Sequence, residues 1–144
     1  MAQSPSKRSA YLHFCELATR WSDNDVYGHV NNVMYYSFFD TAVNRFLIEN
    51  GVLDIQKDAI VGYVVETGCS YFGGVAFPDR LHVGIRVARL GTSSVRYEVA
   101  LFRNDEDEAS AEGHFVHVYV DRGTGRSAPI PEAARRLLAT IAMA

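Results

Sequence analysis

The sequence predicts an α+β domain in which a curved antiparallel sheet wraps around one long helix. Two observations lead to this fold class. A single long helical pattern covers residues 33–50, while short turns divide most of the remaining chain into strand-like runs. That helix is apolar over most of its circumference, so it should be surrounded by protein. A sheet that curls around the helix is the most economical way to bury it in one core.

Length and composition fit a single domain over residues 1–144. The chain is 48% hydrophobic and 22% charged, so it can bury a substantial core of its own. Residues 1–10 are polar and lack the apolar stretch of a signal peptide, so we expect a flexible tail there. The longest apolar runs fall short of the roughly 20 residues that a membrane-spanning helix needs. We therefore expect a soluble, cytoplasmic protein without a membrane partner.

The charge pattern argues against a nucleic-acid-binding protein. The formal net charge is −3, and the 14 basic and 17 acidic residues are interspersed. Nucleic-acid binding would need a clustered basic face. Cys15 and Cys69 lie in strand-like runs without metal-ligand spacing. We expect both to be reduced, buried thiols, with a reactive thiol as the alternative, and we predict no metal site.

The first strand is expected over residues 11–21. A tetrapeptide rich in Asp and Asn follows at residues 22–25 and should end the strand, because these side chains bond to their own backbone in turns. Gly28 can adopt backbone angles that other residues resist. The chain should therefore leave the sheet here and turn into the long helix.

The long helix is expected over residues 33–50. Asn31 or Asn32 can cap its first turn, and Gly51 is suited to the position after its last turn. The polar residues of the helix recur at spacings of three and four, so they form one narrow stripe: Ser37, Asp40, Thr41, Asn44 and Arg45. The other faces are apolar, which favours a central position for the helix.

Four further strands are expected over residues 60–72, 81–89, 94–103 and 109–120. The connections between them are mostly short, which favours antiparallel pairing. A short amphipathic helix is expected over residues 132–142. The element order is thus one strand, one long helix, four strands and one short helix.

The segment from Arg20 to Asp40 holds the densest set of chemically capable residues. Asp25 stands where the turn meets the helix, four residues before His29. A carboxylate at such a place can attack an activated acyl group or deprotonate a water molecule. Asp23 could do the same by sequence alone, and either aspartate could instead be a simple turn former. We choose Asp25 first, because it lies closer to the helix.

The start of the helix offers a second chemical component. Backbone amides from Val30 through Asn31 to Asn32 lack partners within the helix and carry part of its positive end charge. They could stabilise the oxyanion that develops on an ester or thioester carbonyl. His29 is a base, a hydrogen-bond donor or a structural residue. Tyr35 belongs to an aromatic run that should be mainly core and could also line an acyl pocket.

Two features outside this segment also carry possible chemistry. Glu66 is an acidic residue in an otherwise apolar strand. It either occupies an exposed strand face or, if it is buried near Asp25, supplies a second carboxylate. The segment 86–96 collects three arginines and two serines around a glycine turn. That segment is either a solvated hairpin or a phosphate site.

One stretch resembles the signature of the hotdog-fold thioesterases of the 4-hydroxybenzoyl-CoA thioesterase family: DVYGHVNN at residues 25–32, followed by Tyr35. It also resembles plant acyl-ACP thioesterases, except that Tyr27 stands where those enzymes carry Asn. The element order over residues 11–122 is similar to that of one hotdog domain. The resemblance implies hydrolysis of an acyl thioester to a free acid and coenzyme A.

The resemblance also implies roles for individual residues. Asp25 matches the family's catalytic carboxylate, as nucleophile or as general base, and the backbone amide of Asn32 matches the group that polarises the thioester carbonyl. Glu66 lies where acyl-ACP enzymes carry an acidic residue on the following strand. Three residues fall in the region where related enzymes hold the phosphates of coenzyme A: Arg89, Ser93 and Ser94.

We therefore predict a catalytic set of Asp25, His29, Asn32 and Glu66. The predicted substrate-binding set is Gly28, Val30, Asn31, Tyr35, Arg89, Ser93 and Ser94. No cofactor is expected beyond the coenzyme A of the substrate, and the family implies a homodimer or homotetramer with its active site at a subunit interface. An acyl-ACP thioesterase and a non-catalytic acyl-CoA-binding module are the alternatives. A hotdog dehydratase or hydratase is disfavoured, because its paired His and Asp pattern is not visible.

Overall fold

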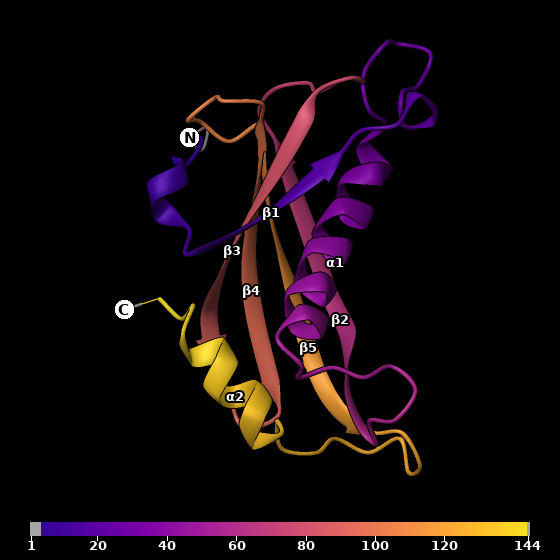
Figure 1. The fold of residues 1–144 in the computed structure, drawn as a ribbon, viewed down its shortest axis with the longest axis vertical. Coiled ribbons are helices and arrows are strands. Elements are labelled where there is room, and N and C mark those ends of the chain that lie inside the picture. Colours follow the sequence, from indigo (N-terminus) through magenta and orange to yellow (C-terminus); the bar gives the residue numbers. More distant parts are fainter. Residues whose placement is uncertain (1–3, 144) are drawn as a thin grey trace.

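A computed structural model describes residues 4–143 (Figure 1). Within these residues, five strands form one antiparallel sheet in the order β1-β3-β4-β5-β2. The strands are β1 (His13–Ala18), β2 (Ile60–Tyr71), β3 (Arg80–Leu90), β4 (Ser94–Arg103) and β5 (Ala111–Asp121). Helix α1 (Asn32–Glu49) crosses one face of the sheet, and the short helix α2 (Glu132–Ala139) lies by the turn between β3 and β4. The predicted α+β class and its hotdog arrangement are confirmed.

The observed strand and helix boundaries differ most from prediction at the two ends of the chain. β1 stops at Ala18, because residues 21–23 form a 3-10 turn instead of continuing the strand. α2 stops at Ala139, because the chain beyond it hydrogen-bonds to β3. There the N–H of Val87 donates to the carbonyl of Ile141 at 2.8 Å. The first difference comes from a local turn that Asp23 closes onto Arg20, whereas the second comes from a distant contact that no local pattern in the sequence signals.

α1 packs against the sheet through a continuous apolar core. Phe39, Ala42 and Val43 are completely buried. The ring of Phe39 meets Phe115 of β5 edge-on, with 6.5 Å between centroids. Gly113 makes room for this ring, since a Cβ there would lie 2.9 Å from Phe39 Cε2. Phe39 thus packs directly on β5.

The opposite side of α1 faces solvent within one chain, so the helix is not surrounded as we expected. Val33 is 66% exposed and Ile48 is 44% exposed. Most of the predicted polar stripe lies on this open side: Ser37, Asp40, Thr41 and Arg45. A single copy therefore leaves apolar helix surface uncovered beside the polar stripe.

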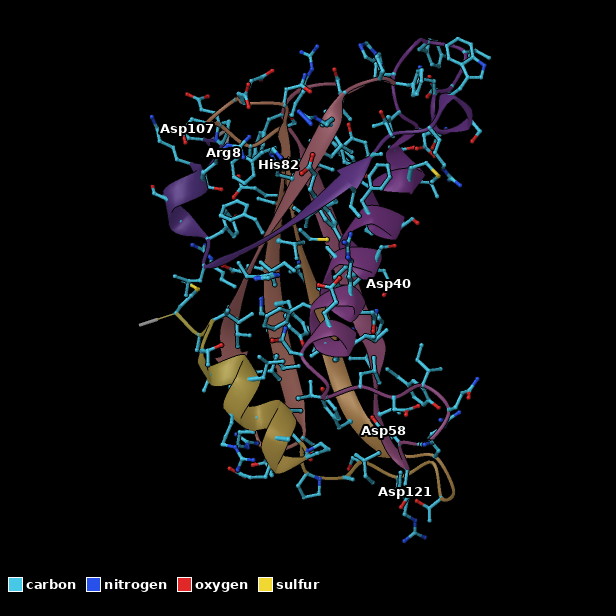
Figure 2. The ribbon with its side chains drawn as sticks, viewed as in Figure 1. Arg8, Asp40, Asp58, His82, Asp107 and Asp121 are labelled. Atoms are coloured by element: carbon cyan, nitrogen blue, oxygen red, sulfur yellow. The ribbon has the colours of Figure 1, made fainter. Side chains whose placement is uncertain are left out.

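The N-terminal segment lies against the sheet and the β4–β5 hairpin (Figure 2). Its Arg8 donates its backbone N–H to the carbonyl of Asp107 at 3.1 Å, and Arg8 Nη1 lies 3.0 Å from Nδ1 of His82. We expected a flexible tail over residues 1–10. Its described part is instead fixed by these bonds, and residues 1–3 lie outside the described residues.

The two cysteines are free thiols, but they differ in burial. Cys15 of β1 is buried, whereas Cys69 of β2 is only half-buried. Our expectation that both thiols would be buried is therefore wrong for Cys69. Burial raises the pKa of both thiols. Separately, no helix among residues 4–143 is both long and apolar enough to cross a lipid bilayer.

His117 should make the stability of the fold depend on pH. It is 2% exposed, and its Nδ1 has no hydrogen-bond partner among the described residues. Burial lowers the pKa of His117, and the charge of Asp40 opposes this only in part. The unfolded chain therefore binds the proton more tightly. We expect the free energy of unfolding to fall as the pH drops through the unfolded value of about 6.5, levelling off below the folded pKa.

Urea unfolding at about pH 7.5 and about pH 5.5 measures this loss. The difference between the two free energies of unfolding should be smaller in His117→Phe than in the wild type. His29→Gln removes an exposed histidine instead and should leave the difference unchanged. An equal acid loss in His117→Phe and the wild type would show that another group titrates.

Candidate active site

A compact turn presents Asp25 at one end of α1. The N–H of Asp25 donates to the carbonyl of His29 at 2.8 Å, and the N–H of Gly28 donates to the carbonyl of Asp25 at 3.1 Å. Gly28 has a φ of +83°, a conformation that strongly favours glycine. One carboxylate oxygen of Asp25 accepts the N–H of Tyr27 at 2.9 Å, and the other has no protein donor among the described residues. The turn therefore orients the carboxylate and leaves one oxygen open.

Asp23 has the structural role that distinguishes it from Asp25. It is 1% exposed, and its carboxylate accepts the backbone N–H of Arg20 at 2.8 Å and the guanidinium at 2.9 Å. Its carbonyl accepts the N–H of Asn31 at 2.9 Å. Asp23 thus closes the turn onto the start of the helix, and Asp25 is the accessible carboxylate.

The start of α1 leaves one backbone amide open. Asn31 caps the helix, because its side-chain oxygen accepts the N–H of Val33 at 3.0 Å and its carbonyl accepts the N–H of Met34 at 2.9 Å. The N–H of Asn32 lies between these bonds and meets no acceptor within residues 4–143. An unpaired amide at a helix N-terminus is suited to an oxyanion.

Two hollows flank the Asp25–Asn32 segment. The hollow beside Asp25 has a volume of about 590 Å³ and is lined by Trp21, Asn24, Asp25, Val26, Tyr27, Gly28 and Asn31. The hollow beside Asn32 has a volume of about 320 Å³ and is lined by His29, Val30, Asn32, Tyr35, Tyr71, Phe72, Gly73 and Gly74. Asp25 and Asn32 thus line separate hollows that share no lining residue.

His29 belongs to the Asn32 hollow and not to the Asp25 hollow. Its ring packs on the backbone of Gly74, where a Cβ would lie 2.9 Å from His29 Cδ2. No hydrogen bond joins the His29 side chain to another group in the described chain. The structure therefore supports His29 as a wall of the site more directly than as a partner of Asp25.

Tyr35 and Tyr71 form the inner wall of the Asn32 hollow. Tyr35 is 3% exposed, so it is mainly core, as expected. The Tyr71 ring meets Tyr35 edge-on at 4.9 Å, and the Tyr71 hydroxyl donates to the carbonyl of Asn32 at 2.9 Å. Our sequence reasoning missed Tyr71. Its position at the end of a strand gives no local sign that it reaches the helix.

The turn around Asp25 is unusually apolar for an exposed loop. Val26 is 95% exposed, Tyr27 84% and Trp21 76%. Trp21 also meets the half-exposed ring of Phe77 edge-on at 6.1 Å. Contiguous exposed apolar residues mark surfaces that a ligand or another protein covers.

Glu66 does not join Asp25 within one chain. Its side chain is 58% exposed and accepts from Nε2 of His114 at 3.0 Å, on the sheet face opposite α1. Glu66 also stands five residues before Tyr71, about 16 Å along the strand. The exposed-face alternative that we considered for Glu66 is the one observed.

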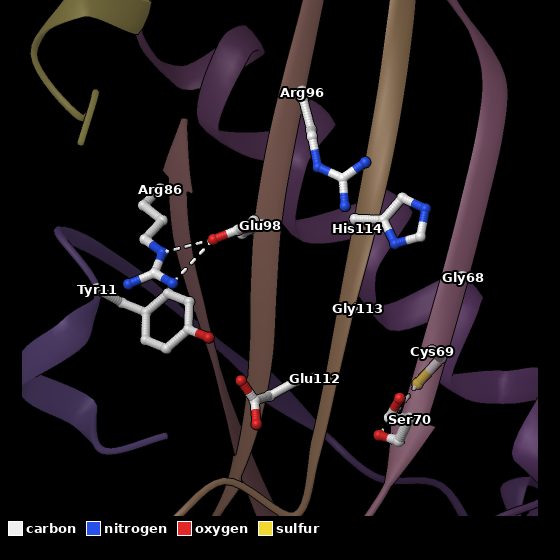
Figure 3. A pocket seen from close by; sticks show the side chains of 10 residues that line it. All are labelled: Tyr11, Gly68, Cys69, Ser70, Arg86, Arg96, Glu98, Glu112, Gly113 and His114. Atoms are coloured by element: carbon white, nitrogen blue, oxygen red, sulfur yellow. Dashed lines mark hydrogen bonds and ion pairs between the residues drawn. The ribbon is translucent and has the colours of Figure 1, made fainter. Parts of the chain in front are cut away.

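A polar hollow of about 270 Å³ occupies this outer face of the sheet (Figure 3). Arg86 binds Glu98 through Nε and Nη2 at 3.0 and 2.8 Å, and Arg86 Nη1 donates to the carbonyl of Ala10 at 2.9 Å. The guanidinium also lies 4.8 Å from the centre of the Tyr11 ring. The charges of Arg86 and Glu98 thus pair with each other, and the contacts of Arg86 with Ala10 and Tyr11 hold the N-terminal segment on the sheet.

Arg89, Ser93 and Ser94 belong to the end of β3, the turn after it and the start of β4. Figure 1 shows this turn at the end of the sheet opposite the loop that leads into α1. β3 begins beside the Asp25 turn, and Arg89 lies nine residues further, about 30 Å along the strand. α2 covers the hairpin there, because Arg135 donates to the carbonyl of Gly91 at 2.6 Å. Within one chain these three residues cannot hold a substrate that reacts at Asp25.

The family of the chain follows from its similarity to known proteins. A profile of the thioesterase-like superfamily matches residues 19–138. The chain belongs to this superfamily. Together with the hotdog fold, this membership supports a thioester hydrolase. Within residues 4–143, no three His, Cys, Asp or Glu side chains gather as a metal site would require.

Three solved structures illustrate the similarity. The PA5185 protein of Pseudomonas aeruginosa is 55% identical, with a TM-score of 0.95, over 97% of this chain and 98% of its own. The PA2801 protein of the same species is 33% identical, with a TM-score of 0.81, over 88% and 97%. A Thermus thermophilus thioesterase in complex with coenzyme A and Zn is 30% identical, with a TM-score of 0.75, over 89% and 98%.

Proposed function

We propose that this protein is an acyl-CoA thioesterase that hydrolyses an acyl thioester to the free acid and coenzyme A. The observation that carries the proposal is the accessible Asp25 carboxylate, held by a turn beside the one open amide at the start of α1. The coenzyme A bound by the Thermus relative favours coenzyme A over an acyl carrier protein as the thiol carrier. The DVYGHVNN motif further supports the 4-hydroxybenzoyl-CoA thioesterase family.

Two chemical routes are open to Asp25. As a nucleophile, its open oxygen bonds to the thioester carbonyl carbon, the C–S bond breaks, and water then hydrolyses the acyl-aspartyl anhydride. As a general base, Asp25 removes a proton from water while the water oxygen bonds to the carbonyl carbon. In both routes the carbonyl oxygen becomes an oxyanion, which the N–H of Asn32 stabilises, and the departing thiolate takes up a proton.

Release of free thiol from a panel of acyl-CoAs tests the proposed function. The panel includes short, long and aromatic acyl groups, together with acyl carrier protein thioesters. We expect turnover of at least one acyl-CoA. Tight binding of an acyl-CoA without thiol release would instead indicate a non-catalytic binding module, and turnover of carrier-protein thioesters alone would move the proposal to an acyl-ACP thioesterase.

We also propose that the protein acts as a homodimer or homotetramer whose copies meet along β2. This edge strand has twelve residues, and its exposed side chains include Tyr63 at 53%, Val64 at 44% and Val65 at 61%. A long apolar edge with free backbone groups is normally covered. Two copies of one strand can pair in antiparallel fashion about a two-fold axis and cover each other. The free thiols also suit a reducing compartment, and we propose the cytoplasm.

Light scattering after size-exclusion chromatography tests the β2 interface. Val65→Lys places like charges close together across the two-fold axis, so we expect this variant to shift from dimer or tetramer towards monomer. Ile55→Lys changes a residue of similar exposure, 62%, in the loop after α1 and should leave the mass unchanged. A monomeric wild type would contradict the proposal.

A further inference from the structure

The contact between Tyr71 and Asn32 is the feature that the proposed chemistry leaves unexplained. Tyr71 stands at the end of β2 and Asn32 at the start of α1, 39 residues apart, yet the phenol donates to the Asn32 carbonyl at 2.9 Å. Tyr71 is 43% exposed, so its hydroxyl could have been solvated by water instead. The bond joins the sheet to the residue that carries the open amide.

We propose that Tyr71 is a positioning residue of the thioesterase site, which holds the first turn of α1 so that the Asn32 amide meets the oxyanion. This inference rests on the function proposed above. Tyr71 acts through Asn32 and leaves the reacting atoms untouched.

The first turn of a helix is less restrained than the interior, because its backbone N–H groups have no acceptor within the helix. A contact from outside the helix can therefore fix its orientation. The peptide group before Cα of Asn32 is fixed where the Asn31 carbonyl accepts the N–H of Met34 at 2.9 Å. The peptide group after it is held at both of its polar atoms: the N–H of Val33 donates to Asn31 Oδ1 at 3.0 Å, and the carbonyl of Asn32 accepts the Tyr71 hydroxyl from the sheet. These bonds together limit rotation on both sides of Cα, and so they set the direction of the Asn32 N–H.

The phenol itself is held well enough to act as a restraint. Its ring packs edge-on against Tyr35, which is 3% exposed and part of the main core. Burial raises the pKa of Tyr71, with Cys69 adding to the effect, so the hydroxyl stays protonated and remains a donor. A hydroxyl on a packed ring of a sheet strand has less positional freedom than a hydroxyl on a flexible side chain.

Tyr71→Phe tests the proposal because it removes the hydroxyl and keeps the ring. Removing an oxyanion donor outright lowers kcat by about 10²–10³-fold, and a donor that is only misplaced should lose less. We expect kcat to fall about 5- to 30-fold while KM stays within about twofold and the melting temperature is nearly unchanged. Tyr97→Phe is the control, since the Tyr97 hydroxyl on β4 is buried and has no hydrogen-bond partner within residues 4–143.

Two results would overturn the proposal: an unchanged kcat in Tyr71→Phe, or an equal loss of kcat in Tyr97→Phe. If kcat is unchanged and KM is raised, Tyr71 binds the substrate directly. Amide hydrogen exchange by NMR gives a readout that does not need activity. The N–H of Val33, which donates to Asn31 Oδ1, should exchange faster in Tyr71→Phe. A wild type that hydrolyses no thioester would overturn the proposed function. Unchanged exchange in the variant would show independently that Tyr71 does not hold the turn.

Discussion

Asp25→Asn should lower kcat for acyl-CoA hydrolysis by about 10²–10⁴-fold, the range typical of losing a catalytic acid or base. Asparagine has nearly the same shape as aspartate and can still accept the N–H of Tyr27, so the turn should persist. What disappears is the negative charge on the open oxygen, which both proposed routes require. Thiol release under saturating acyl-CoA measures kcat, and KM should change much less.

Asp23→Asn is the matched control for Asp25→Asn. Asp23 is 1% exposed and accepts three hydrogen bonds from Arg20, so its replacement should lower the melting temperature. The folded fraction of Asp23→Asn should keep far more activity than Asp25→Asn. Equal rates in Asp25→Asn and the wild type would remove Asp25 from the mechanism, and equal losses in both variants would show that the turn alone matters.

Features of the fold that depend on local chemistry could be predicted from the sequence. The spacing of apolar residues gave α1, the φ of +74° at Gly51 matches its predicted place after the helix, and Asn31 caps the first turn. The strand order could not be predicted, because it depends on pairings between distant residues. The same is true of Arg8, whose guanidinium donates to the carbonyl of Asn104, 96 residues away.

The candidate site shows the same division between local and distant contacts. Asp25 opens the turn that leads into α1 and Asn32 is the first residue of that helix, only seven residues later, so the sequence could predict that they lie near each other. Tyr71 reaches Asn32 only because β2 ends beside α1. The predicted role of Glu66 depended on which face of the sheet it occupies, and a β-bulge between Val64 and Glu66 shifts the register just before it.

The predicted phosphate-binding residues raise a different question. Arg89 lies near the far end of β3, and Ser93 and Ser94 follow in the turn and at the start of β4, so none of them reaches the Asp25 site within one chain. If they hold coenzyme A, they must come from another copy. The open side of α1, the apolar turn around Asp25 and the exposed edge of β2 are the surfaces that the proposed dimer or tetramer would cover.

Phe39→Ala should lower the free energy of unfolding by about 3–5 kcal/mol, as is usual when a large buried aromatic is truncated. Phe39 is completely buried between α1 and β5, and Gly113 already lacks the side chain that could fill the cavity left behind. Urea unfolding measures the loss. Ile48→Ala on the same helix, at a residue 44% exposed, should lose about 1 kcal/mol or less. Similar losses in both variants would mean that α1 is not seated on the sheet through Phe39, and the position of the Asn32 amide would then need another support.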